Sequence, residues 1–353
     1  MNNKKVLGIL LSVLLGFLAG AVFLSVMGLS AVKAYGRLFQ SLSGIRRFSY
    51  VIVTAVPYIV TGLSVAFSFR TGLFNIGAEG QFVVGTLAAL LTGILLPTFP
   101  KGILIPLCFA AALLVGALWG VLVGWMKVRF GINEVLSMIM FNWMAFYLCN
   151  YITGLPGVKN EGSAEATRNL PETARLLFRK DLIRRAGLCP KANWGIIVAM
   201  MLAVLVWFIL EKTDLGFRLR AVGLNKNAAE YAGISVGKSL LISLAFSGAL
   251  SGLAGALYVM GTAGRIPVFT MQEGYGFAGI VVALIGLANP FGILAAGLFY
   301  GMLIYGGTRL NLVGAPTQLV NVIIGTIVFF ISISVIFERI RLKKASKEGK
   351  ENG

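Results

Sequence analysis

The sequence contains no histidine, only three cysteines and few charged residues. Without histidine, catalytic histidines, histidine metal ligands and histidine proton relays are all excluded. The cysteines, Cys108, Cys149 and Cys189, are too scattered for a disulfide framework or a zinc site. Charged residues make up 12% of the 353 residues, whereas a soluble domain carries roughly 25%. A soluble enzyme therefore fits this composition poorly.

Acidic residues are scarcer than basic ones, 13 against 31, which gives a formal net charge of +18. The basic residues lie in loops and at the termini, so we expect them to face membrane lipid rather than nucleic acid. Only Glu79, Glu134 and Glu273 lie near apolar segments. An ion-driven transporter is expected to bury carboxylates in its coupling site. Their scarcity argues against ion coupling, and Glu79 keeps that alternative open.

Long apolar segments dominate the remainder of the chain. Hydrophobic residues make up 58% of it and the mean hydropathy is +0.87; several runs reach the roughly 20 residues that a bilayer requires. We therefore predict an all-α integral membrane protein, a glycine-rich bundle forming one domain over 1–353. The first run is too long for a signal peptide, so an uncleaved helix is expected. About ten spans are predicted, at 6–29, 49–69, 79–97, 102–126, 135–155, 194–210, 239–261, 276–289, 291–307 and 317–337.

Lysines at both ends of the chain predict its orientation. Lys4 and Lys5 precede the first span, and a basic tail at about 338–353 follows the last, so both termini are expected in the cytoplasm. An even number of spans satisfies this. Loop 156–193 then lies outside and loop 211–238 inside. The outer loop is itself basic, against the usual bias, and is expected to be an ordered lobe, a contact for an external partner or a solvated linker.

Small residues recur at helical spacing along several spans. Lipid supplies no hydrophobic force between helices, so close packing relies on such residues. The serine stripe in the seventh span predicts helix contact, with a pore lining as the alternative. The stripes are Gly116, Gly120 and Gly124; Ser239, Ser243, Ser247, Ser251 and Gly255; Gly16 and Gly20; and Gly297 and Gly301.

Polar residues interrupt the apolar pattern at 70–81. Gly72, Gly77 and Gly80 make a continuous helix unfavourable there, and Asn75, Glu79 and Gln81 cluster between two apolar runs. Broken helix and polar groups at membrane depth are tolerated where they line a cavity or are buried in protein. The segment is therefore our first candidate for a solute pathway. The alternative is a cytoplasmic turn whose polar groups meet water.

A second polar group opens the fifth span. Asn133 and Glu134 are suited to capping that helix. Asn142 and Trp143 lie deeper, where an amide beside aromatic rings suits either an uncharged, stackable solute or contact between helices.

The loop 211–238 is longer than a simple reversal needs. Within it, Gly233 to Ser239 resembles a phosphate loop, but the glycine spacing is one residue short and no strand is expected before it, so we reject ATP binding. Residues 225–234 predict a short helix with Asn225 as N-cap and Gly233 as C-cap. Its slim face suits a groove of another protein; the alternative is an inert helix on the membrane surface. The candidate docking residues are Asn225, Ala228, Ala229, Glu230, Gly233 and Ile234.

Four segments together resemble a known family. RAVGLNKNAAEYAGISVGKS with SGALSGLAGAL resembles the coupling region of bacterial ABC-transporter permeases of the branched-chain amino acid and sugar import type. GLFNIGAEGQ, GINEVLSMIMFNW and GYGFAGIVVALIGLANPFG resemble the members that import nucleosides.

The resemblance implies a ten-span importer permease in a bacterial cell membrane. It implies pairing with a second, homologous permease, with cytosolic ATPases that use the ATP, and with an external solute-binding lipoprotein. It makes 225–234 the coupling helix, places Asn75, Glu79 and Gln81 in the translocation region, and gives the chain no cofactor, metal or catalytic residue of its own. It also suggests an inverted repeat of spans 2–5 and 7–10.

The sequence pattern alone leaves several other functions open. They are a permease for a sugar or branched-chain amino acid, an ion-coupled secondary transporter, a passive channel, and an intramembrane enzyme using Ser247.

Overall fold

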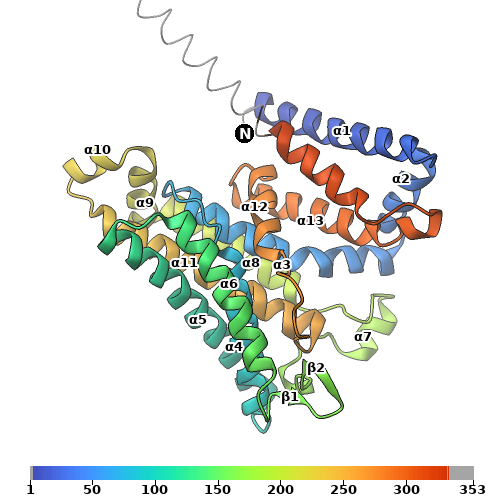
Figure 1. The fold of residues 1–353 in the computed structure, drawn as a ribbon, viewed down its shortest axis with the longest axis horizontal. Coiled ribbons are helices and arrows are strands. Elements are labelled where there is room, and N and C mark those ends of the chain that lie inside the picture. Colours follow the sequence, from blue (N-terminus) through green and yellow to red (C-terminus); the bar gives the residue numbers. More distant parts are fainter. Residues whose placement is uncertain (1–2, 332, 334–353) are drawn as a thin grey trace, which may run out of the picture. The chain divides into compact units, whose positions relative to one another are not determined.

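The computed structural model describes residues 3–331 and 333, and it is almost entirely helical (Figure 1). The helices are α1 (Asn3–Val26), α2 (Ala31–Phe39), α3 (Ile45–Phe69), α4 (Ala78–Leu95), α5 (Lys101–Phe130), α6 (Glu134–Thr153), α7 (Lys180–Arg185), α8 (Gly195–Lys212), α9 (Asp214–Leu224), α10 (Lys226–Tyr231), α11 (Val236–Tyr258), α12 (Tyr275–Ile285) and α13 (Pro290–Gly307), with 3₁₀ turns η1 (Gln40–Leu42), η2 (Glu172–Ala174) and η4 (Leu310–Val313), a π-helical turn η3 (Val259–Ala263) and strands β1 (Lys159–Asn160) and β2 (Ser163–Thr167).

The predicted spans coincide with helices of the structure. Among the described residues, eight helices are long and apolar enough to cross a membrane, and two shorter apolar helices, α12 and Leu319–Ile331, occupy the eighth and tenth predicted positions. The prediction of an all-α membrane protein is confirmed. The end of the tenth predicted span and the tail 338–353 lie outside the described residues. The eighth span was predicted too long: α12 ends at Ile285, because the backbone turns through Leu287 and Ala288 in left-handed conformations.

The chain divides into two compact units, with one boundary between Ser43 and Gly44 and the other within α13, between Gly301 and Met302. Unit 1 comprises Met1–Ser43 and Met302–Gly353. In it, the Gly16 and Gly20 positions of α1 face Ile327 and Ile323, where a Cβ on either glycine would come within 2.7 Å of the isoleucine side chain. These glycines therefore serve helix contact, as predicted. The expectation of one domain over the whole chain stays a prediction.

Unit 2, Gly44–Gly301, is built around α11. One face of α11 meets α5 through glycines: a Cβ on Gly248 would lie 2.3 Å from the Gly116 carbonyl oxygen, and one on Gly116 would lie 2.4 Å from that of Gly248. Gly120 likewise meets the Leu244 carbonyl. The two backbones approach so closely that no side chain fits between them. The glycine stripe of α5 is thus a helix contact.

A neighbouring face of α11 carries the serine stripe, which packs against α3, α4 and the segment between them. Ser243, Ser247 and Ser251 are fully buried. The Ser64 hydroxyl of α3 donates to the Ser247 carbonyl at 2.6 Å, and the Ser247 hydroxyl donates back to the Ser64 carbonyl at 2.8 Å. Helix contact, rather than a pore lining, is the role of this stripe.

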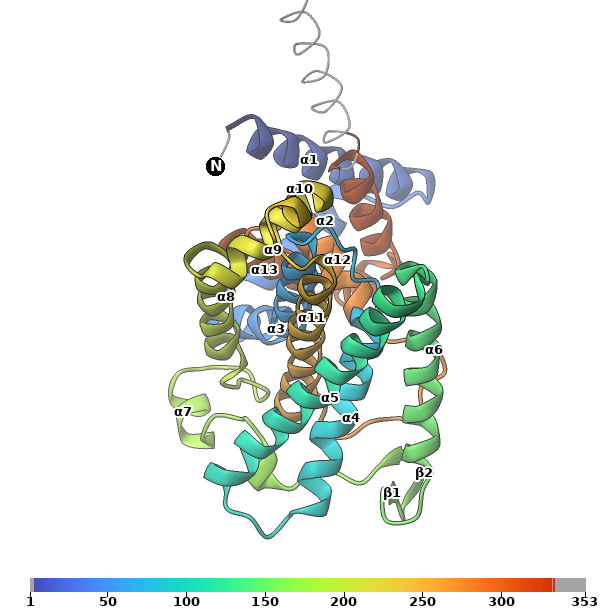
Figure 2. The same ribbon diagram turned by 90° about the vertical axis from the view of Figure 1, so that its left-hand side faces the viewer.

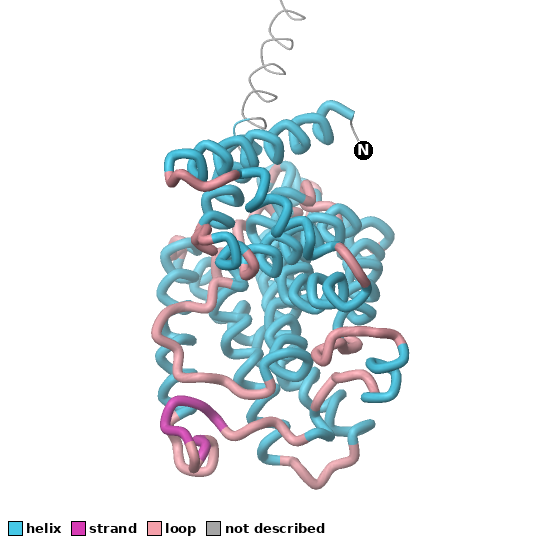
Figure 3. The backbone as a smooth tube through the Cα atoms, turned by 90° about the vertical axis from the view of Figure 1, so that its right-hand side faces the viewer, coloured by secondary structure: helices cyan, strands magenta, loops and turns pink. Residues whose placement is uncertain are grey.

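Loop 156–193 forms an ordered lobe rather than a solvated linker. It contains the antiparallel pair β1–β2, η2 and α7, and it buries Leu170, Ala174 and Cys189. Figure 3 shows the strands at one end of unit 2. Figures 1 and 2 both place α9 and α10 at the other end. The two loops that were predicted to lie on opposite sides of a membrane therefore lie at opposite ends of this unit.

Candidate functional site

The helix break predicted at 70–81 is present between α3 and α4, and its polar groups are buried. Asn75 and Gln81 have no exposed surface. The Asn75 amide donates to Oε1 of Gln81 at 2.8 Å and to the Ser247 hydroxyl at 2.6 Å. Thr71 donates to the Ser243 hydroxyl at 2.9 Å. The interpretation of this segment as a turn meeting water is wrong, because its polar groups find partners on α11.

Ser247 is fully engaged in this network. Its hydroxyl donates to the Ser64 carbonyl and accepts from Asn75, and it is completely buried. A nucleophilic serine needs an adjacent base and access to a substrate. The partners of Ser247 are a carbonyl, an amide and a second hydroxyl, so its surroundings suit packing rather than catalysis.

Glu79 joins two helix N-termini. It lies in the first turn of α4, and its two carboxylate oxygens accept from the backbone N–H groups of Gly274 at 2.7 Å and Gly276 at 2.6 Å. Those groups belong to the start of α12, whose first N–H groups have no intrahelical partner. A Cβ on Gly276 would lie 2.1 Å from the Glu79 nitrogen. The Glu79 carboxylate thus accepts from the otherwise unpaired N–H groups at the start of α12, and its negative charge complements the positive ends of both helices.

Asn142, which belongs to α6, forms hydrogen bonds with the start of α4. Its Oδ1 accepts from Gly80 N–H at 2.8 Å, and its amide donates to the Ile76 carbonyl at 3.1 Å. Trp143, by contrast, is 43% exposed and stacks on Tyr147. Four of the five predicted pathway residues therefore meet around the start of α4, while Trp143 faces outward from this chain. Contact of any of them with solute stays a prediction.

A tyrosine cluster beside α12 was not anticipated. Tyr275 lies between Tyr58 and Phe82, with ring centroids 5.1 Å and 4.8 Å away. Tyr258 packs 4.7 Å from Tyr275 and lies near Glu273. Tyr58, Tyr258, Tyr275 and Glu273 are only partly buried. The available signal was Tyr58 within the second predicted span, together with Tyr258 at the end of α11 and Tyr275 at the start of α12.

The predicted short helix at 225–234 is present as α10 with the predicted N-cap, and its C-cap is Ala232, one residue before the predicted Gly233. The Asn225 side chain accepts from Ala228 N–H at 3.1 Å, which confirms it as the N-cap. Gly233 follows the helix in a left-handed conformation with φ +79°. Its N–H bonds to the Glu230 carbonyl and that of Ile234 to the Ala229 carbonyl, the Schellman pattern. The sequence did not predict the separate helix α9, which Thr213 caps.

A groove of about 520 Å³ lies along α9 and α10. Its lining residues include Phe217, Ala221, Leu224, Ala228, Gly233 and Ile234. Phe217 and Leu224 are 59% and 88% exposed. Isolated exposed apolar residues are ordinary, but large ones gathered at a groove indicate an interaction surface. The segment from Gly233 to Ser239, which resembles a phosphate loop in sequence, connects helix α10 to the start of helix α11.

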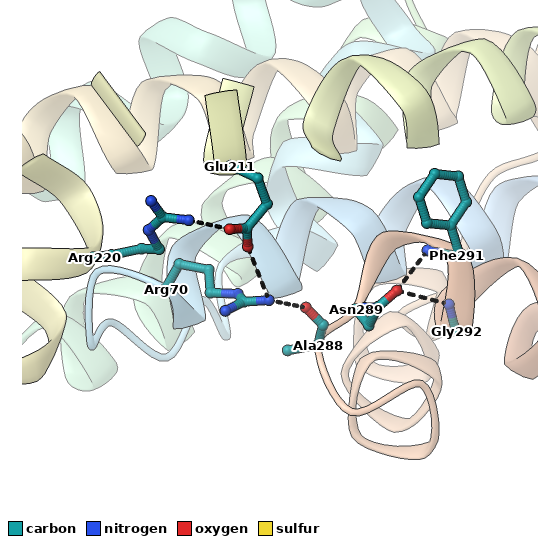
Figure 4. Close-up of polar contacts among 7 residues, drawn as sticks. All are labelled: Arg70, Glu211, Arg220, Ala288, Asn289, Phe291 and Gly292. Atoms are coloured by element: carbon teal, nitrogen blue, oxygen red, sulfur yellow. Dashed lines mark hydrogen bonds and ion pairs between the residues drawn. The ribbon is translucent and has the colours of Figure 1, made fainter. Parts of the chain in front are cut away.

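An ion-pair network connects this region to the rest of unit 2 (Figure 4). Glu211, in the last turn of α8, pairs with Arg220 of α9 and lies 3.7 Å from the Arg70 guanidinium. Arg70, directly after α3, also donates to the Ala288 carbonyl at 3.5 Å. Asn289 caps α13 by accepting from the N–H groups of Phe291 and Gly292. No group of three His, Cys, Asp or Glu suited to a metal occurs among the described residues.

Comparison with known proteins identifies the family. Residues 47–332 match the family described as "Branched-chain amino acid transport system / permease component". The guanosine ABC transporter permease protein NupP of Bacillus subtilis is 38% identical, with 96% of each chain covered. The nucleoside ABC transporter permease protein NupB of Lactococcus lactis is 33% identical over 100% of this chain and 99% of its own.

Two further relatives bear on substrate and assembly. The glucose ABC transporter permease protein TsgB13 of Haloferax volcanii is 33% identical over 94% of this chain and 88% of its own. A second guanosine ABC transporter permease protein of Bacillus subtilis, NupQ, is 32% identical over 71% of this chain and 78% of its own. The chain belongs to the family of branched-chain amino acid transport system permease components.

Proposed function

We propose that this chain is the membrane-spanning permease subunit of an ATP-driven nucleoside importer. The observation that carries the proposal is its similarity, over nearly the whole of both chains, to NupP and NupB. A sugar is the second candidate solute, because TsgB13 is similar over almost the same length. A branched-chain amino acid is third, supported by the family description.

The polar and aromatic groups near α12 support a nucleoside. Tyr58, Tyr258 and Tyr275 offer partly exposed rings and hydroxyls, and Glu273 adds a carboxylate. A nucleoside presents a planar base and several hydrogen-bonding groups, which such side chains recognise by stacking and hydrogen bonding. We propose that solute passes this cluster and the region of Asn75, Glu79, Gln81, Asn142 and Trp143.

Both termini are proposed to lie in the cytoplasm of a bacterial cell. The lysines near each end support this orientation. The positions of α9–α10 and the 156–193 lobe at opposite ends of unit 2 fit two loops on opposite sides of the membrane. In this orientation α9 and α10 face the cytosol. The lobe is then external, on the side where a solute-binding lipoprotein would deliver the solute.

Partner subunits complete the transporter in this proposal. Two similar permeases, NupP and NupQ, in one bacterium support pairing of this chain with a second, homologous permease. ATP is bound and hydrolysed by a cytosolic ATPase that docks in the α9–α10 groove. Its movement on ATP binding would push α10, with Asn225, Ala228, Ala229, Glu230, Gly233 and Ile234 as the docking segment.

Replacing Gly233 with valine is expected to lower uptake while ATP hydrolysis continues. Its φ of +79° costs a residue with a Cβ about 1–2 kcal/mol, and a Cβ there meets nothing within 4 Å. The change should therefore distort the end of α10 without disturbing the bundle. Gly157→Val is the control, because Gly157 has φ +84° and open space in the opposite lobe. Wild-type uptake by Gly233→Val would contradict the docking role.

Uptake by membrane vesicles tests the function itself. Vesicles containing the complete transporter are expected to accumulate radiolabelled guanosine against a gradient when ATP is supplied, with competition by other nucleosides but not by glucose or leucine. Competition by glucose would favour the sugar alternative. Uptake driven by an ion gradient without the ATPase would show a secondary transporter, and equilibration without accumulation would show a channel.

A further inference from the structure

We propose that Glu211 is a positioning residue that ties α9 and α10 to the α3–α4 break and the α12–α13 turn, so that movement of the docking helices reaches the buried polar segment. The inference rests on the proposed function in one respect, that an ATPase docks on α9 and α10. It assigns a role to Glu211, Arg220, Arg70 and Gly223, which lie outside the docking segment.

The first link is a contact between two backbones. A Cβ on Gly223, near the end of α9, would lie 2.1 Å from the Arg70 carbonyl oxygen and 3.1 Å from the Thr71 carbonyl carbon. A Cβ on Gly72 would lie 3.5 Å from the Gly223 Cα. The end of α9 therefore rests directly on the residues that follow α3. Packed backbones transmit displacement because they cannot interpenetrate.

The second link is the shared carboxylate of Glu211, which Figure 4 shows between Arg220 and Arg70. The Arg220 pair closes the corner between α8 and α9. The Arg70 pair connects that corner to the end of α3. Without Glu211, the two guanidinium groups would have no carboxylate between them to offset their mutual repulsion. Glu211 thus links α9 to the end of α3, in addition to the backbone contact at Gly223.

The third link reaches the α12–α13 turn. Arg70 donates to the carbonyl of Ala288, and Leu287 and Ala288 both have positive φ, 55° and 50°. Non-glycine residues hold such conformations only where surrounding contacts enforce them. In the other direction, Thr71 and Asn75 bind the serines of α11. A shift at Arg70 would therefore affect the turn before α13 and the buried amides together.

These ion pairs contribute little to stability, so an effect on coupling can be distinguished from an effect on folding. The side chains of Arg70, Glu211 and Arg220 are 32%, 37% and 28% exposed. Exposed ion pairs contribute about 0.2–1 kcal/mol to stability, so neutralising Glu211 should leave the protein folded. The loss should appear instead in the amount of solute moved for each ATP hydrolysed.

The test uses the complete transporter in proteoliposomes, with radiolabelled guanosine as solute. Glu211→Gln is expected to lower guanosine transported per ATP hydrolysed at least about fivefold, the lower end of allosteric coupling effects, while the complex stays assembled and ATP hydrolysis continues. Arg220→Gln should behave alike, and Arg220→Lys should retain the wild-type ratio because it keeps the charge. A wild-type ratio in Glu211→Gln would overturn the proposal.

Glu134→Gln is the matched control. It removes the carboxylate of another partly buried ion pair, with Lys127, which joins α5 to α6 and does not touch Arg70. It is expected to keep the wild-type transport ratio. An equal fall in both variants would show that any ion pair between these helices matters, and would overturn the specific role of Glu211.

Hydrogen exchange on the same complexes gives a readout that needs no solute. The N–H groups of Leu287, Ala288 and Asn289 are bonded within the α12–α13 turn. Their exchange should quicken in Glu211→Gln and not in Glu134→Gln, because the Arg70 contact to the turn is loosened. Unchanged exchange would overturn the proposal. If the wild-type transporter failed to move guanosine, guanosine would be excluded as the solute. The hydrogen-exchange measurement would still decide the role of Glu211.

Discussion

Replacing Glu79 with alanine is expected to remove most of the folded protein from the membrane. The change leaves the N–H groups of Gly274 and Gly276 without an acceptor. Each buried, unsatisfied group costs about 1–3 kcal/mol, and together they correspond to more than about a tenfold fall in the folded-to-unfolded ratio. The measurement is the yield and melting temperature of the purified complex, alongside guanosine uptake.

Two further variants make the Glu79 result interpretable. Glu161→Ala removes an exposed carboxylate from the 156–193 lobe and is expected to change neither quantity. Glu79→Gln keeps one carbonyl oxygen for one of the two N–H groups and should be intermediate in stability. Wild-type stability of Glu79→Ala would contradict the helix-joining role. Normal folding of Glu79→Gln with uptake abolished would instead favour direct contact with solute, as its position in the predicted pathway suggests.

Replacing Gly248 with valine is expected to separate α5 from α11 and to destabilise unit 2. A Cβ on Gly248 would lie 2.3 Å from the Gly116 carbonyl oxygen and 3.0 Å from its carbon, so the backbone itself must move. Overpacking typically costs about 1–3 kcal/mol and occasionally more, and rigid backbone on both sides favours the upper end. Thermal unfolding in detergent should show a lower midpoint.

Gly102→Val is the control for that experiment. Gly102 lies on α5 itself, and a Cβ there meets nothing within 4 Å. Its valine variant loses the same glycine without a clash, so its melting temperature should stay close to wild type. Equal destabilisation of the two variants would mean that glycine conformation within a helix, rather than the α5–α11 contact, sets the effect.

The predicted caps at Asn133 and Asn225 show what local sequence can determine. The Asn133 side chain accepts from the N–H groups of Val135 and Leu136, and Asn225 does so from Ala228. Each interaction spans at most three residues, so residue type and position suffice to anticipate it. The predicted C-cap was one residue late in strict terms, because Ala232 is the C-cap and Gly233 follows it.

The hydrogen-bond partners of the buried polar residues could not be predicted in the same way. Asn75 was singled out from its sequence surroundings, but its partner Ser247 lies 172 residues further along the chain. Glu79 was recognised as unusual, yet its acceptor role depends on a loop 195 residues away. Side-chain type identifies a group that needs a partner and leaves the partner's identity open.

The sequence by itself determined the membrane class, the approximate positions of the spans, the break between α3 and α4, and the short helix at 225–234. These follow from hydropathy, glycine placement and capping, which act over one or two helical turns. Only the tertiary structure decided that Glu79 joins two helix N-termini, that the serine stripe is a contact surface, and that Glu211 links α8, α9 and α3. Those roles depend on which distant backbone groups each side chain meets, and that is set by the packing of whole helices.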